Sequence, residues 1–125
     1  MEYVKSFKDL EVYKYSKELS KAVYETSKGF PKEEMYSLSD QVRRSSRSVG
    51  AQIAEAWGKR KYPKHFVSKL TDSDAEQLET QHWIETALDC SYISEETAND
   101  LLQMCHSIGR MIYSMIKKSD TFCKS

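Results

Sequence analysis

Glycine, proline and long apolar runs are all scarce in this chain of 125 residues. It contains four glycines and two prolines, and the two main groups of these helix breakers lie in residues 29–31 and 58–63. No apolar run approaches the ~20 residues that a membrane-spanning helix needs, so we predict no membrane segment. No stretch alternates between apolar and polar residues for long enough to build a sheet, which favours an all-helical fold.

The chain also has no formal net charge, and its number of cysteines is odd. The 19 Lys and Arg residues balance the 19 Asp and Glu residues, so the bulk charge gives no attraction to nucleic acid or anionic lipid. Three cysteines, an odd number, agree with a reducing compartment. The first residues lack the apolar segment and the small-residue cleavage site of a signal peptide. We therefore expect a cytoplasmic protein.

Four segments show the three- and four-residue spacing that marks one face of an α-helix. The residues predicted to form the buried faces are Leu10, Tyr13, Ser16, Leu19, Val23 and Ser27 in the first segment, Leu38, Val42, Ser45, Val49, Ile53 and Trp57 in the second, Phe66, Leu70, Leu78, Ile84, Ala87 and Leu88 in the third, and Ala98, Leu101, Cys105, Ile108, Ile112 and Met115 in the fourth.

Capping residues indicate where these helices begin. Ser6 with Asp9 precedes the first segment and Ser94 precedes the fourth, while Ser37 indicates a kink or a restart inside the second. Short connections between amphipathic helices favour antiparallel neighbours. We predict an all-α protein with one domain over residues 1–118, an antiparallel up-down-up-down four-helix bundle, followed by a flexible C-terminal tail over residues 119–125.

Charge is strongly segregated along the chain. Residues 43–64 hold seven basic residues and one acidic residue, whereas residues 71–109 hold nine acidic residues and no Lys or Arg. Because a short connection should place the second and third helices side by side, we expect Arg47 to lie level with about Asp74. Arg43 or Arg44 should then lie level with Glu76 or Glu79.

Three interpretations of this segregation remain open. In the first, Arg43, Arg44 and Arg47 form ion pairs within the chain, with Asp74, Glu76 and Glu79. In the second, basic groups left without partners bind phosphates, namely Arg43, Arg44, Arg47, Lys59, Arg60, Lys61 and Lys64, with Tyr62 available for base stacking. In the third, acidic and basic faces meet between subunits, and small residues such as Ser45 and Ser48 let another helix approach closely.

Catalytic and metal-binding patterns are not found. Glu79 and His82 supply one Glu-x-x-His pattern, whereas a di-iron bundle needs two. Cys105 and His106 are adjacent on a helix and point about 100° apart, which prevents a nucleophile–base pair. We therefore predict no enzymatic activity, no metal and no cofactor.

A series of short motifs resembles a known family. In order, these are Phe7-Lys8-Asp9-Leu10, Val12-Tyr13, Phe30-Pro31 with Glu34, Gln41-Val42-Arg43-Arg44, Ser48, Ile53-Ala54-Glu55, Leu78-Glu79-Thr80 and Tyr92-Ile93. The chain resembles, over roughly residues 7–116, the four-helix bundle proteins named after the 23S rRNA intervening sequence.

This resemblance implies a helical bundle that assembles as a homopentamer and has no catalytic residues. Some members of that family are encoded within insertions in large-subunit rRNA genes, and the architecture is similar to that of accessory proteins of diversity-generating retroelements, which work with nucleic acid. Our leading hypothesis is a non-enzymatic homo-oligomeric scaffold, associated with rRNA, another nucleic acid or a protein partner. The alternative is a module that binds RNA or DNA directly through the basic residues named above.

Overall fold

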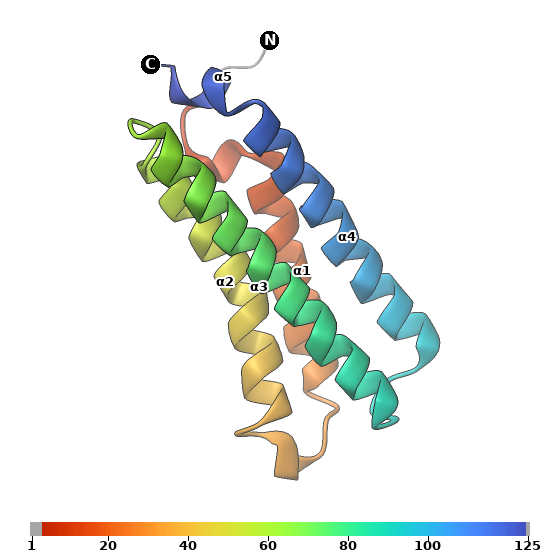
Figure 1. The fold of residues 1–125 in the computed structure, drawn as a ribbon. Coiled ribbons are helices and arrows are strands. Elements are labelled where there is room, and N and C mark those ends of the chain that lie inside the picture. Colours follow the sequence, from red (N-terminus) through yellow and green to blue (C-terminus); the bar gives the residue numbers. More distant parts are fainter. Residues whose placement is uncertain (1–3, 125) are drawn as a thin grey trace.

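Four long helices form an antiparallel bundle, which confirms the predicted fold class. The computed structural model describes residues 4–124. Its long helices are α1 (Glu11–Ser27), α2 (Leu38–Gly58), α3 (Pro63–Asp89) and α4 (Glu95–Lys117), and its short elements are η1 (Phe7–Asp9), η2 (Lys32–Glu34) and α5 (Ser119–Cys123). The long helices run alternately up and down (Figure 1). Helices α1 and α3 each pack against α2 and α4, so the α1–α2 face lies opposite the α3–α4 face.

None of the described helices combines the length and the apolar character needed to cross a lipid bilayer.

Capping and turn contacts form at the predicted helix starts. Ser6 and Asp9 make a reciprocal capping box, which encloses the single turn η1 just before α1. The second segment restarts as predicted, because η2 ends at Glu34 and α2 begins at Leu38, whose amide donates to the Glu34 carboxylate (3.2 Å). The Ser94 hydroxyl accepts from the Thr97 amide and caps α4 (3.1 Å).

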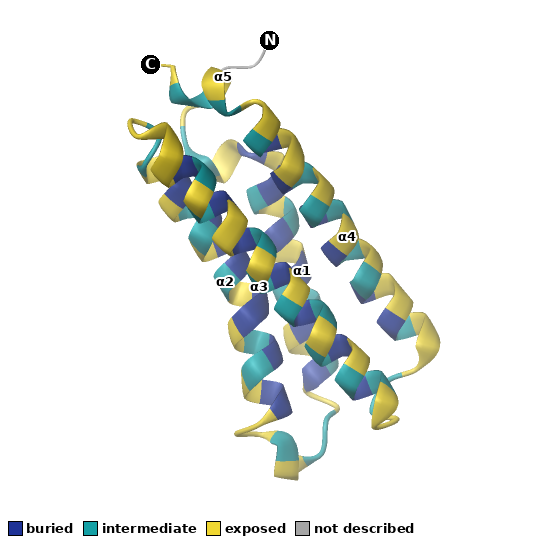
Figure 2. Cartoon of the chain, in the orientation of Figure 1, coloured by how far each residue is buried: buried dark blue, intermediate teal, exposed yellow. Residues whose placement is uncertain are grey.

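The core follows the predicted faces of α1, α2 and α4. Every predicted residue of α4 is buried, and only Tyr13 in α1 and Trp57 in α2 are partly exposed. Figure 2 shows these buried positions as stripes that face the inside of the bundle. Burial of such side chains contributes roughly 1.5–3 kcal/mol each, which makes this core the main source of stability.

Helix α3 departs from the predicted pattern. Leu78 was expected in the core but is 54% exposed, while Ser73, Gln77 and Thr80 are buried. The Ser73 hydroxyl donates to the Val49 carbonyl (2.8 Å), and the Thr80 hydroxyl lies 2.8 Å from that of Ser45. Because these short polar side chains are hydrogen bonded, burying them costs little, and α3 can approach α2 closely.

The C-terminal residues form structure where the sequence predicts a flexible tail. Ser119–Cys123 form the short helix α5, and the Phe122 ring stacks on the buried Phe66 ring of α3 with centroids 6.1 Å apart. Apolar burial of Phe122 explains why this turn is ordered. The sequence does not reveal this in advance, because the residues around Phe122 are polar. Ser125, the end of the predicted tail, lies outside the described residues.

Gly50 of α2 packs directly against Ser16 and Tyr13 of α1. A Cβ atom at Gly50 would lie 2.9 Å from the Ser16 Oγ atom, which already donates to the Tyr13 carbonyl (2.6 Å). We expect Gly50→Ala to destabilise the chain by about 1 kcal/mol, because the steric cost exceeds the gain in helix propensity. In a Ser16→Ala background the same substitution should stabilise it by about 1 kcal/mol. Urea denaturation of the four proteins measures this coupling, and an effect of the same sign in both backgrounds would contradict it.

Candidate functional site

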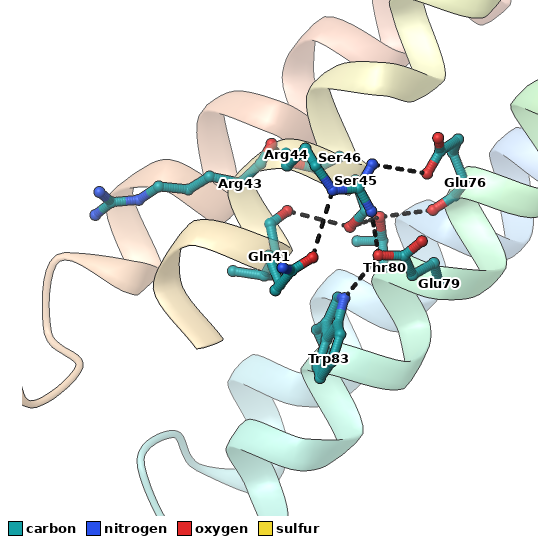
Figure 3. A network of polar contacts seen from close by, with 10 residues as sticks. Gln41, Arg43, Arg44, Ser45, Ser46, Glu76, Glu79, Thr80 and Trp83 are labelled. Atoms are coloured by element: carbon teal, nitrogen blue, oxygen red, sulfur yellow. Dashed lines mark hydrogen bonds and ion pairs between the residues drawn. The ribbon is translucent and has the colours of Figure 1, made fainter. Parts of the chain in front are cut away.

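Arg44 joins α2 to α3 through a polar network. Its guanidinium forms ion pairs with Glu76 (3.5 Å) and Glu79, and its Nε atom donates to Gln41 Oε1 (3.4 Å). The Trp83 indole N–H also donates to Glu79 Oε2 (3.0 Å), and Figure 3 shows these side chains converging between the two helices. These ion pairs agree with the prediction that Arg43 or Arg44 lies level with Glu76 or Glu79.

The network shifts the pKa values of both charged partners. The Trp83 hydrogen bond and the neighbouring Arg44 lower the pKa of Glu79 below its usual value of 4.5. The hydrogen bond to Glu79 raises the pKa of Arg44. Both side chains are more than one-third exposed, so water screens the pair and its contribution to stability is small.

The lowered pKa of Glu79 gives stability a pH dependence with a defined sign. The folded state favours the carboxylate, so this stabilisation is present above the unfolded pKa of 4.5 and is lost as pH falls through the lower folded pKa. Glu79→Gln should therefore destabilise the chain at neutral pH and have less effect at about pH 3. Urea denaturation at both pH values tests this, and an equal difference at each would contradict it.

Arg43 and Arg47 do not form the expected ion pairs but turn towards α1. The Arg43 Nε atom donates to Ser27 Oγ (2.7 Å), and the guanidinium groups of Arg43 and Arg47 lie 4.8 Å and 5.6 Å from the centre of the Tyr24 ring. Figure 3 shows Arg43 extending away from the α3 carboxylates. Successive helix residues point about 100° apart, whereas residues four apart share a face, so Arg44 alone reaches α3.

Asp74, the expected partner of Arg47, lies on the α4 side of α3. Its Oδ1 atom accepts from Gln77 Nε2 (2.9 Å) and is 3.6 Å from the Cβ position that a side chain at Gly109 would occupy. In the described residues, no carboxylate lies within 4.0 Å of the Arg43 or Arg47 guanidinium. The charges of these two arginines are therefore not neutralised by an ion pair within the described residues.

The two opposite faces of the bundle carry different grooves. On the α1–α2 side, which we call the arginine face, one groove is lined by Lys17, Glu18, Ser20, Lys21, Tyr24 and Arg47. On the α3–α4 side, a second groove contains Leu78 and Tyr113, which are 54% and 62% exposed. This second groove could not be expected from the helical spacing, which predicted Leu78 to lie in the core.

The turn between α2 and α3, together with the first residues of α3, carries four basic residues that form no ion pair within the described residues. Lys59, Arg60, Lys61 and Lys64 have no carboxylate within 4.0 Å in the part of the chain that the structure describes. The Arg60 guanidinium stacks 3.6 Å from the centre of the Trp57 ring, and its Nε atom donates to the Trp57 carbonyl (2.9 Å). Lys61 and Lys64 are exposed, so their ammonium groups are open to an anion.

The residues considered for metal binding or catalysis differ in their contacts and in their burial. Glu79 is engaged by Arg44, whereas His82 is exposed and packs edge-on against Trp83. Burial raises the pKa of the Cys105 thiol to about 12, and the adjacent His106 is exposed. Among the described residues, no group of three or more His, Cys, Asp or Glu side chains is placed to hold a metal ion.

The chain is similar to a described family and to a solved structure. Residues 8–114 match the family described as 23S rRNA-intervening sequence protein. The fold is also similar to the crystal structure of a protein with unknown function from the S23 ribosomal protein family of Bacteroides thetaiotaomicron, with 28% sequence identity and a TM-score of 0.76. The similarity covers 85% of this chain and 95% of that one. No curated protein matches the sequence.

Proposed function

Because the chain belongs to the 23S rRNA-intervening sequence protein family, we propose that it is a cytoplasmic, non-enzymatic scaffold that assembles with copies of itself. The number of copies is five, as the resemblance to the family implies. The observation that carries this proposal is the placement of Arg43 and Arg47 on the arginine face, where neither has a carboxylate of the described residues within 4.0 Å. The assembly would present repeated surfaces to an RNA or a protein partner.

The opposite side of the bundle is formed by α3 and α4, the helices that span the acidic stretch of the sequence. Residues 71–109 carry nine acidic residues, and in the described residues only Glu76 and Glu79 among them form ion pairs. Leu78 and Tyr113 add exposed apolar surface to the same side. When two different faces of a subunit meet, the contact repeats from copy to copy and can close into a ring. Opposite charge on the two faces would fix which face meets which.

Charge reversal on the arginine face tests this proposal. The double variant Arg43→Glu, Arg47→Glu should shift the particle towards the 14.5 kDa monomer, because acidic faces would then repel each other. The matched control Lys61→Glu, Lys64→Glu changes the net charge equally at the α2–α3 turn and should leave the mass unchanged. Light scattering after size exclusion gives both masses. An equal loss of mass in the control, or none in the variant, would contradict the assignment of this face.

Direct binding of RNA or DNA is the second candidate function. It is favoured by the four basic residues of the α2–α3 turn and the start of α3, which lack acidic partners within the described chain. Neutralising phosphates with such groups releases counterions, so affinity should fall steeply as salt rises. Mobility shift of labelled total RNA at two salt concentrations tests this candidate, and no shift at low salt would rule it out.

A further inference from the structure

One end of the bundle gathers basic residues from three segments that are far apart in sequence. These segments are residues 4–10, 59–64 and 117–124, which we call the basic end. The antiparallel topology brings the α2–α3 turn and the described residues at both ends of the chain to the same end (Figure 1). Helix α5 packs against α3 through the Phe122 and Phe66 rings, so the third segment is fixed beside the second.

Charge is polarised along the length of the bundle. The basic end holds nine Lys and Arg residues against Asp9 and Asp120, a net charge of +7. The connecting segments at the other end, residues 28–37 and 89–96, hold two basic and five acidic residues, a net charge of −3. None of the nine cations lies within 4.0 Å of a carboxylate of the described residues. A polyanion would therefore be drawn to one end and repelled from the other.

Tyr62 places an accessible aromatic ring inside this charged surface. It lies between Lys61 and the first residues of α3 and is 60% exposed. The His65 ring is its aromatic neighbour, with centroids 5.7 Å apart. The Trp57 ring, in contrast, is already covered by the Arg60 guanidinium. Tyr62 thus has a ring face for a planar ligand group, with cations on either side of it in the sequence.

We propose that the basic end binds single-stranded nucleic acid, with phosphates on its lysines and an unpaired base stacked on Tyr62. This inference rests on the second candidate function above. Aromatic side chains surrounded by cations suit single strands, because every unpaired base offers a flat face for stacking. In a duplex the bases are stacked on each other and present only their edges, so Tyr62 gains nothing from a paired strand.

Fluorescence anisotropy with labelled oligonucleotides of about 15 bases tests this inference on the full chain. The probes are a single-stranded RNA, a DNA of the same sequence and the corresponding duplex RNA. We expect both single strands to bind more tightly than the duplex. Tyr62→Ala should weaken single-strand binding about tenfold. The control Tyr36→Ala removes a ring that is 89% exposed at the opposite end and should have no effect.

The charges are tested by the dependence of affinity on salt. For single strands, each phosphate contact contributes about −0.7 to the slope of log affinity against log salt. Lys61→Ala with Lys64→Ala should therefore reduce the magnitude of the slope by about 1.4. Lys28→Ala with Lys32→Ala changes the net charge equally at the opposite end and should leave the slope unchanged. Circular dichroism confirms that each variant keeps its helices.

The possible failures distinguish the inference from the function on which it rests. If no probe binds at low salt, both the inference and the second candidate function are wrong. If single strands and duplex bind equally and Tyr62→Ala has no effect, the single-strand inference is wrong while nucleic-acid binding stands. If the two lysine pairs reduce the slope equally, the binding surface is not the basic end.

Discussion

Phe66→Ala should destabilise the bundle by about 3–5 kcal/mol, the cost of removing a fully buried aromatic ring. Phe66 is completely inaccessible to solvent and lies near the start of α3, where its ring stacks on Phe122 of α5. The substitution leaves a cavity and removes the apolar contact that holds α5 in place. Urea denaturation followed by circular dichroism measures the change in the free energy of unfolding.

Two further variants separate the core contribution of Phe66 from its contact with α5. Phe122→Ala should cost less than Phe66→Ala because Phe122 is only partly buried, and its effect should be largely lost in a Phe66→Ala background. A cost below about 1 kcal/mol for Phe66→Ala would show that this end of the bundle is not packed as described.

Ser73→Leu should be the most disruptive substitution at the contact between α2 and α3. Ser73 is fully buried, and its hydroxyl donates to the Val49 carbonyl of α2 (2.8 Å). A leucine would enlarge a side chain at the point where two helix backbones approach, which costs about 1–3 kcal/mol or more. The measurement is again the free energy of unfolding in urea.

The control for Ser73→Leu uses an exposed position on the same helix. Ala75→Leu adds apolar volume two residues away, where the side chain is exposed, and should change stability by no more than about 0.5 kcal/mol. If both leucine variants have equally small effects, α2 and α3 do not meet through small residues.

The predictions from sequence succeeded where burial and hydrophobicity coincide. On α1, α2 and α4 the apolar period alone identifies the core, as at Leu19, Ile53 and Ile108. On α3 burial and hydrophobicity do not coincide. Ser73 and Thr80 are buried because hydrogen bonds compensate for their burial, while Leu78 faces outward. Periodicity cannot reveal this, since it reads hydrophobicity rather than satisfied polar groups.

The charged surfaces could be predicted only in part. The short α2–α3 connection predicted that Arg43 or Arg44 lies level with Glu76 or Glu79, and Arg44 forms these ion pairs. The side-chain directions of Arg43 and Arg47 depend instead on the packing of α1 beside α2. The basic residues of the turn could be found from sequence alone. The sequence alone could not show that these residues lie beside the C-terminal segment, because this depends on the packing of α5 against Phe66.

Sedimentation equilibrium of the unmodified chain at micromolar concentration tests the central proposal of self-assembly most directly. We expect one species with five times the 14.5 kDa mass of the chain, dissociating as salt weakens the contact between the arginine face and the acidic side of α3 and α4. A single species of 14.5 kDa at low salt would contradict the proposal.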